Sequence, residues 1–246
     1  MKNFISNYKK LCSEYYDLDK PTAPKDALNY YYKESLKAGG LVLEPMCGTG
    51  RFLIPLLEKG INIHGVDASS EMLKLCEGKC KNKNLSPTLY FESLTNLKLS
   101  NKYNYMFIPS GSFGLLTSED DAKESLRQLF NYLSDQGAID VEVERPYLTF
   151  EVGAKTESYV TRSDGTKIKL IVIKEYNFLS NVETLDCTYE NIINNKIICT
   201  EKEVMKIKHY SENDFRELAS SIGFKEVKLC KPYNKNEDVN LFRCIK

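Results

Sequence analysis

The chain has 246 residues, 42% of them hydrophobic and 28% charged, which suits one elaborated α/β domain or two small globular units. Its 34 basic and 34 acidic side chains give a formal charge of zero, which disfavours a nucleic-acid partner bound mainly through phosphates. Apolar runs stay shorter than the roughly 18 residues of a membrane span and the eight cysteines are scattered, so we expect a cytoplasmic protein with reduced thiols and no membrane contact.

The apolar pattern alternates between helical and extended periods along most of the chain. A helical N-terminal segment is interrupted between Pro21 and Pro24, and helices are then predicted over residues 25–37, 51–59, 71–81, 118–133 and 211–221. Strands are predicted over residues 41–43, 61–66, 88–91, 103–108, 138–143, 225–229 and 239–244. Strands that alternate with helices in this way imply a parallel sheet with helices on both faces.

Residues 156–208 lack the helical period of the preceding part. Turns are predicted near residues 163–165, 180–181 and 194–195, and Leu185, Cys187 and Tyr189 alternate along one face of an extended run. We therefore predict an antiparallel meander of about four strands, inserted in the α/β frame. Its exposed strand edges suggest pairing between subunits, so a homodimer through this insert is a further expectation.

The most informative stretch is a strand, a glycine turn and a helix, followed by a second strand that ends at Asp67. Gly48 and Gly50 let the backbone approach a ligand, and Asp67 can accept hydrogen bonds from ribose hydroxyls. Glu44 at the end of the first strand would repel the pyrophosphate of a dinucleotide, and Leu53 replaces that motif's third glycine. The lysine that a P-loop needs after its last glycine is missing too.

These features resemble motifs I and II of the class I S-adenosylmethionine-dependent methyltransferases, whose ligand has an adenosine, a sulfonium, an ammonium and no phosphate. The resemblance covers about residues 28–144 and 209–246. It implies a Rossmann-like, doubly wound, seven-stranded sheet with an antiparallel last strand, and makes the meander a lid. The implied divisions are a helical cap over 1–37, the cofactor-binding domain over 38–146 and 209–246, and the lid over 147–208.

The resemblance also assigns the cofactor contacts. Glu44 serves the methionine end, Asp67 the ribose, and Met72 packs on the adenine unless it is an ordinary core residue. The other expected contacts are Tyr16, Cys47, Gly48, Gly50, Ala68, Ser93, Leu94 and Pro109. Met46 replaces the family's first glycine, and since a side chain must fit there, we expect a φ angle below zero.

Three further assignments keep an alternative. Ser93 aligns with the acid that often binds the adenine amino group, but Glu92 takes that role if the register differs by one residue. Tyr16, like Tyr15, either covers the sulfonium by a cation–π contact or fills the core. Cys47 is as consistent with packing as with cofactor contact.

The implied reaction is an in-line displacement at the cofactor's methyl carbon by a nucleophilic atom of the acceptor, with S-adenosylhomocysteine as product. Proximity and alignment can contribute roughly 7–11 kcal/mol to such a step. His209 is the preferred candidate for a general base because histidine titrates near neutrality, and Glu142 and Glu144 are alternatives. We expect no metal site, since Cys76 and Cys80 share a helix face but have no further ligand nearby.

A lid over the strand ends favours a small-molecule acceptor, methylated on N or O, as in N-methyltransferases acting on amino sugars or amino acids. The loop after residue 108 lacks the signature of enzymes that methylate DNA amino groups. Three alternatives stay open. One is a tRNA or protein methyltransferase, another is a non-catalytic module that binds S-adenosylmethionine, and the last is a nucleotide-dependent oxidoreductase.

Overall fold

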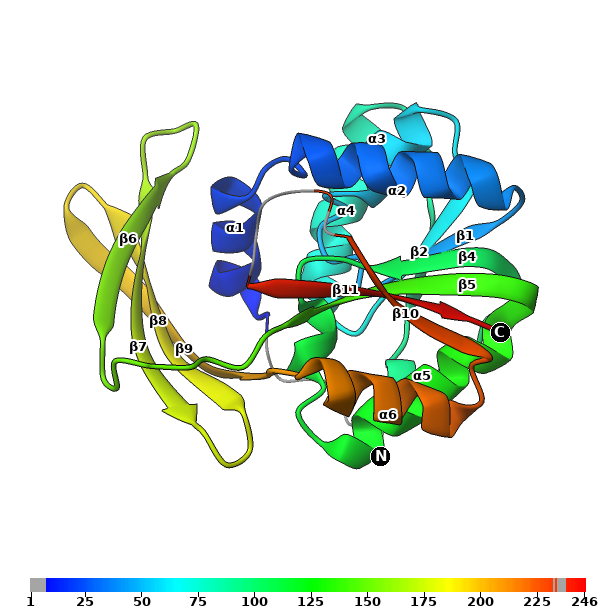
Figure 1. Ribbon diagram of the computed structural model, residues 1–246. Coiled ribbons are helices and arrows are strands. Elements are labelled where there is room, and N and C mark those ends of the chain that lie inside the picture. The colour runs from blue at the N-terminus through cyan, green and yellow to red at the C-terminus, as the bar shows by residue number, and fades with distance from the viewer. Residues whose placement is uncertain (1–7, 232, 234–237) are drawn as a thin grey trace.

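The protein contains two sheets, seen side by side in the computed structural model, which describes residues 8–231, 233 and 238–246 (Figure 1). The larger sheet has seven strands in the order β10-β11-β5-β4-β1-β2-β3, and the smaller has four in the order β6-β7-β8-β9. Strands β1 to β5 of the larger sheet run parallel, and β11 runs antiparallel to both of its neighbours. The predicted fold class, including the antiparallel last strand, is confirmed.

The elements follow the order predicted from the sequence. The strands of the larger sheet are β1 (Val42–Pro45), β2 (Ile63–Asp67), β3 (Thr88–Phe91), β4 (Tyr103–Ile108), β5 (Leu133–Glu144), β10 (Glu226–Cys230) and β11 (Val239–Ile245). The helices are α1 (Lys10–Asp19), α2 (Lys25–Ala38), α3 (Leu53–Glu58), α4 (Ser70–Asn82), α5 (Glu119–Tyr132) and α6 (Glu212–Ile222), with short 3-10 turns at Leu94–Asn96 and Ser112–Leu115.

Helices cover both faces of the larger sheet. Figure 1 shows α2, α3 and α4 on one face and α5 and α6 on the other. The central strands are therefore buried on both sides, with Val42 and Phe107 packed in one core cluster and Leu43 and Ile139 in the other. This double burial explains why the central strands read as nearly continuous apolar runs.

Serine side chains fix the start of the helices that bracket the site. The hydroxyl of Ser69 accepts a hydrogen bond from the backbone N–H of Met72 at 3.2 Å and caps α4. Ser211 caps α6 in a reciprocal capping box with Asp214. The helix after the glycine turn is shorter than predicted, because the chain stays in turns until α3 begins at Leu53.

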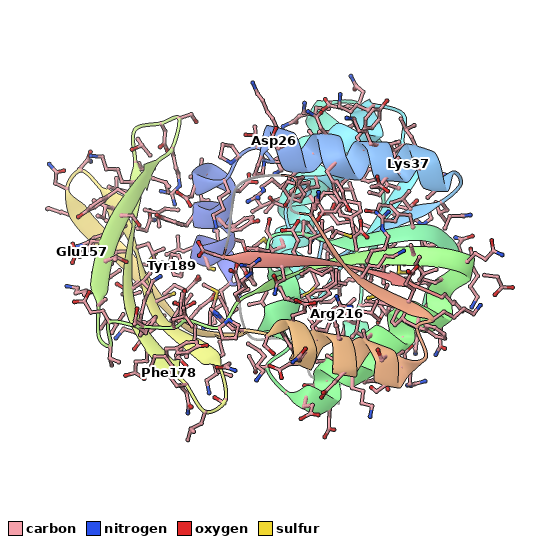
Figure 2. All side chains as sticks on the ribbon, in the orientation of Figure 1. Asp26, Lys37, Glu157, Phe178, Tyr189 and Arg216 are labelled. Carbon is pink, nitrogen blue, oxygen red and sulfur yellow. The ribbon has the colours of Figure 1, made fainter. Side chains whose placement is uncertain are left out.

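The lid is the antiparallel sheet of β6 (Lys155–Thr161), β7 (Lys167–Asn177), β8 (Val182–Ile193) and β9 (Lys196–Lys208). Its inner face packs on α1, which lies between the lid and the larger sheet (Figure 1). Tyr189 is on this inner face and Glu157 on the outer one (Figure 2). The alternation predicted for Leu185, Cys187 and Tyr189 therefore gives the lid an apolar face that buries Leu11 and Tyr15 of α1.

Candidate functional site

A cavity of about 350 Å³ lies at the carboxyl ends of the parallel strands. Its walls come from the loops after β1, β2, β3 and β4, from the end of β5, from α1 and from the inner face of the lid. This is the edge of an open α/β sheet at which ligands bind. The predicted cofactor residues that line it are Tyr16, Gly48, Asp67, Ala68, Met72, Ser93 and Leu94.

Four other predicted residues lie behind the cavity wall instead of lining it. These are Glu44, Cys47, Gly50 and Pro109. Cys47 packs so tightly on β2 that a Cβ placed on Gly65 would lie 2.7 Å from its sulfur. A Cβ on Gly50 would lie 2.6 Å from the sulfur of Cys76, so this glycine permits close packing against α4.

The glycine turn differs from expectation at one residue. The φ angle of Met46 is 58°, in the left-handed region, so the prediction of a negative angle was wrong. The left-handed turn carries the chain back toward β2, where the N–H of Cys47 donates to the carbonyl of Val66 at 3.1 Å. Met46 and Gly48 both line the cavity.

Asp67 ties the glycine turn to the start of α4. One carboxylate oxygen accepts the backbone N–H of Gly48 and the other accepts that of Ser69, each at 2.8 Å. Burial raises the pKa of Asp67, while these hydrogen bonds lower it. Asp67 lines the cavity, and each of its oxygens can accept a further hydrogen bond, which suits two vicinal hydroxyl groups.

Glu44 is a buried acid, only 2% exposed, at the end of β1. Its Oε2 has no hydrogen-bond partner among the residues that the structure describes, and burial raises its pKa well above the usual range. The guanidinium of Arg51 opposes that rise. Arg51 lines the cavity, donates to the hydroxyl of Ser110 at 3.1 Å, and leaves its buried Nε unpartnered within the same described part.

Glu142 on β5 supports the loop after β4. It accepts hydrogen bonds from the hydroxyls of Tyr31 and Tyr233 and, at 2.8 Å, from the backbone N–H of Ser110. Ser110 and Gly111 both adopt left-handed backbone angles, with φ of 59° and 68°. Since a serine in this conformation is strained, the carboxylate of Glu142 is engaged in holding this turn.

Glu144, two residues further along β5, lines the cavity. A Cβ placed on Gly111 would lie 2.7 Å from its Oε1, so a side chain at this position would displace the carboxyl group. Burial raises the pKa of Glu144, the imidazole of His209 opposes that rise, and the carboxylate of Glu183 adds to it. This places an acid of raised proton affinity against the loop after β4.

Residues 42–137 match the sequence model of a family described as a methyltransferase domain. The relatives include the YqeM protein of Bacillus subtilis, 26% identical over 189 residues that cover 72% of each chain. Another is the glycine/sarcosine N-methyltransferase of Aphanothece halophytica, 25% identical over 142 residues, or 56% of this chain and 54% of that one.

Solved structures share the whole architecture. The sugar N-methyltransferase KedS8 from a Streptoalloteichus species superposes with a TM-score of 0.78 at 16% identity, over 95% of this chain and 91% of that one. The amino pentose methyltransferase CalS10 from Micromonospora echinaspora gives 0.72 at 13% identity, over 98% of each chain. Residues 42–137 therefore carry a methyltransferase domain. The methyltransferase domain predicted from the sequence is thereby confirmed, and S-adenosylmethionine remains its predicted cofactor.

The buried groups of this methyltransferase fit the methionine end of that cofactor. Among the described residues, Oε2 of Glu44 is an unpartnered acceptor for an ammonium, and Nε of Arg51 is an unpartnered donor for a carboxylate. Arg51 lines the cavity, whereas Glu44 is not among the residues that line it. Arg51 was not among the cofactor contacts predicted from the sequence. The available signal was its position directly after the last motif glycine, Gly50.

His209 lies outside the residues that line the methyltransferase cavity. Its ring is packed at the base of the lid, with centroids 4.8 Å from Tyr147 and 5.3 Å from Tyr176. Its Nδ1 donates to the carbonyl of Arg145 at 2.7 Å, and its Nε2 lies 3.6 Å from a carboxylate oxygen of Glu183. His209 therefore packs where the lid leaves the larger sheet and does not line the cavity. Glu144 does line it and is the candidate base.

Helix α1 closes the methyltransferase cavity from the side of the lid. Tyr8, Cys12, Tyr15 and Tyr16 line the cavity from this segment. Within the described part of the chain, no group of three His, Cys, Asp or Glu side chains could hold a metal ion. No helix of that same part is long and apolar enough to cross a membrane.

Proposed function

We propose that the protein transfers the methyl group of S-adenosylmethionine to an amine nitrogen of a small molecule. The observation that carries this proposal is the cavity, in which Asp67, Met72 and the other lining residues expected for the cofactor share one space with Glu144 and the lid. An acceptor held there meets the methyl donor away from bulk water. The names of KedS8 and CalS10 specify a sugar N-methyltransferase and an amino pentose methyltransferase, which supports nitrogen as the methylated atom.

We assign the cofactor positions as follows. Asp67 binds the ribose hydroxyls, and Met72 and Leu94 enclose the adenine. Ser93 and Glu92 both line the cavity, so both remain candidates for the adenine amino group. In the proposed division of the chain, residues 38–146 and 209–246 hold the cofactor, residues 147–208 form the lid, and α1 from the segment 1–37 covers the site.

The protein's part in the reaction is to align the two reactants and to remove a proton. When bound, S-adenosylmethionine supplies a methyl carbon on a cationic sulfur, and the new N–C bond forms as the C–S bond breaks with its electron pair left on sulfur. Glu144 takes the proton that an acceptor ammonium must lose before its lone pair can attack. The raised pKa of Glu144 favours that proton uptake.

The test measures S-adenosylhomocysteine binding by calorimetry and methyl transfer to a panel of amines with labelled cofactor. We expect Asp67→Ala to weaken binding at least about tenfold, since hydrogen bonds to a charged group contribute roughly 1.5–3 kcal/mol each. Asp186→Ala on the exposed outer side of the lid is the matched control. Binding that survives Asp67→Ala would contradict the cofactor assignment, and binding without any turnover would indicate a non-catalytic module.

A further inference from the structure

The lid gives the acceptor side of the cavity an apolar wall. The lid residues that line it are Leu170, Leu185, Tyr189, Met205 and Ile207. Leu170 pairs with Tyr189, and Leu185 pairs with Met205, across neighbouring strands. Because paired residues of adjacent strands share one face of a sheet, these side chains form a continuous surface.

Charge is distributed unevenly around the cavity. Its cationic lining residues among the described ones are Arg51, after the glycine turn, and Lys20, at the end of α1. Both belong to the elements that surround the cofactor, and none of the lid residues that line the cavity is charged. Glu144 lines the cavity and lies against Gly111 of the loop after β4. An acceptor carboxylate would therefore face apolar side chains and a like charge, whereas an ammonium would face an opposite charge.

We infer that the acceptor is a primary or secondary amine on a largely apolar body that bears no carboxylate, such as a highly deoxygenated amino sugar or an alkyl amine. This inference rests on the proposed amine methylation. It separates the protein from its relative that acts on glycine and sarcosine, since a free amino acid would bring its carboxylate to Glu144. Each buried methylene of the acceptor should improve kcat/KM roughly fourfold.

The experiment compares matched acceptors at saturating S-adenosylmethionine. One pair is leucine and 3-methylbutylamine, which differ only in the carboxylate. A second pair is 2-amino-2-deoxyglucose and an aminohexose of the same ring with fewer hydroxyl groups. We expect kcat/KM to favour the amine over leucine by at least about a hundredfold and the deoxygenated sugar by at least about tenfold, following two to three additional buried methylene equivalents.

Two variants test whether the apolar wall and Glu144 cause these acceptor preferences. Met205→Gln keeps the side-chain length but adds a polar group to the wall, and should reduce the preference for the deoxygenated sugar. Val204→Asn, on the outer face and 51% exposed, is the control. Glu144→Gln should narrow the ratio of 3-methylbutylamine to leucine, because the like charge that repels the carboxylate is removed.

The outcomes separate this inference from the proposed function. Turnover of leucine or of the fully hydroxylated sugar at rates equal to their partners would overturn the inference and leave amine methylation intact. If S-adenosylhomocysteine binds but no amine in either pair is methylated, the proposed function fails, and the inference fails with it.

Discussion

Glu44 is the residue at which burial and charge conflict most directly. Its carboxyl group is almost fully buried, and this burial raises its pKa well above the usual range and so shifts the equilibrium toward the protonated form. A cationic amino-acid end beside it lowers that pKa again. We therefore predict that S-adenosylmethionine binding near neutral pH releases up to about one proton per site.

Calorimetry in buffers of different ionisation enthalpy measures this proton directly. Glu44→Gln, which keeps the shape of the side chain but cannot ionise, should remove the release and weaken binding. Glu190→Gln removes a charge from the outer face of the lid and serves as the control, because Glu190 does not line the cavity. An unchanged proton release in Glu44→Gln would show that another group titrates.

Glu144 should set the acidic limb of the pH profile. Its pKa is raised, so its carboxylate is lost at a higher pH than that of a free glutamate, near 4.3. We predict that wild-type kcat/KM falls as the pH drops through this raised value. Glu144→Gln should lower kcat/KM about a hundredfold, the smaller end of general-base effects, and remove that limb.

A stability measurement distinguishes this role from a structural one. Because the folded-state pKa of Glu144 lies above the unfolded value, ionisation of this group costs stability as the pH rises. Glu144→Gln should therefore keep or raise the Tm at pH 8 while activity falls. Equal losses of Tm and activity would instead assign Glu144 to the fold.

The sequence predicts individual contacts best where a motif prescribes them. Gly48, Asp67 and Met72 stand where the motif spacing places them, at the cavity. The difference between Glu142 and Glu144 was not predictable, because residues two positions apart on a strand share one face and strand periodicity cannot separate them. The angle of Met46 depends on a hydrogen bond to β2 that sequence spacing does not show.

At the scale of elements, the lid supplies the N-terminal cap that α1 lacks. Lys9 at the N-cap position makes no side-chain capping bond. Glu203 of β9 accepts the backbone N–H groups of Tyr8 and Lys9 at 2.8 and 2.6 Å, and Glu201 accepts those of Leu11 and Cys12 at 3.3 and 3.0 Å. Two carboxylates from the far end of the chain thus stabilise the positive end of this helix.

We predict that Glu203→Ala loosens α1 and thereby weakens S-adenosylhomocysteine binding about tenfold, the effect expected from losing one charge-assisted set of bonds. Hydrogen exchange of residues 10–19 should increase in the same variant. Glu190→Ala, elsewhere in the lid, is the control. Fast exchange in α1 with unchanged affinity would show that this helix does not cover the cofactor.

The sequence located most elements because their ends carry local signals. The serine caps of α4, α5 and α6 are short-range hydrogen bonds that a few residues specify. The position of α1 has no such signal, since the carboxylates that bind its N-terminal N–H groups lie about 190 residues away in the sequence. Long-range pairing of this kind emerges only with the fold.

For the whole molecule, the lid is an insertion whose two ends meet. The backbone N–H of Tyr210 donates to the carbonyl of Glu144 at 2.8 Å, so the chain leaves and re-enters the larger sheet at one point. Replacing residues 146–208 with a short Gly–Ser linker should therefore leave the seven-stranded sheet able to fold. We predict cooperative unfolding of this variant, loss of methyl transfer, and S-adenosylhomocysteine binding weakened more than tenfold because α1 loses its capping carboxylates.

The same variant tests the homodimer expected through the lid edges. Light scattering should give a dimer for the full chain and a monomer after lid removal, because β6 and β9 are the open edges of that sheet. Insertion of the same linker between Asn194 and Asn195, at the turn joining β8 and β9, keeps the lid and is the control. A lidless protein that still dimerises would place the interface on the larger sheet, and one that still methylates amines would show that the acceptor does not bind under the lid.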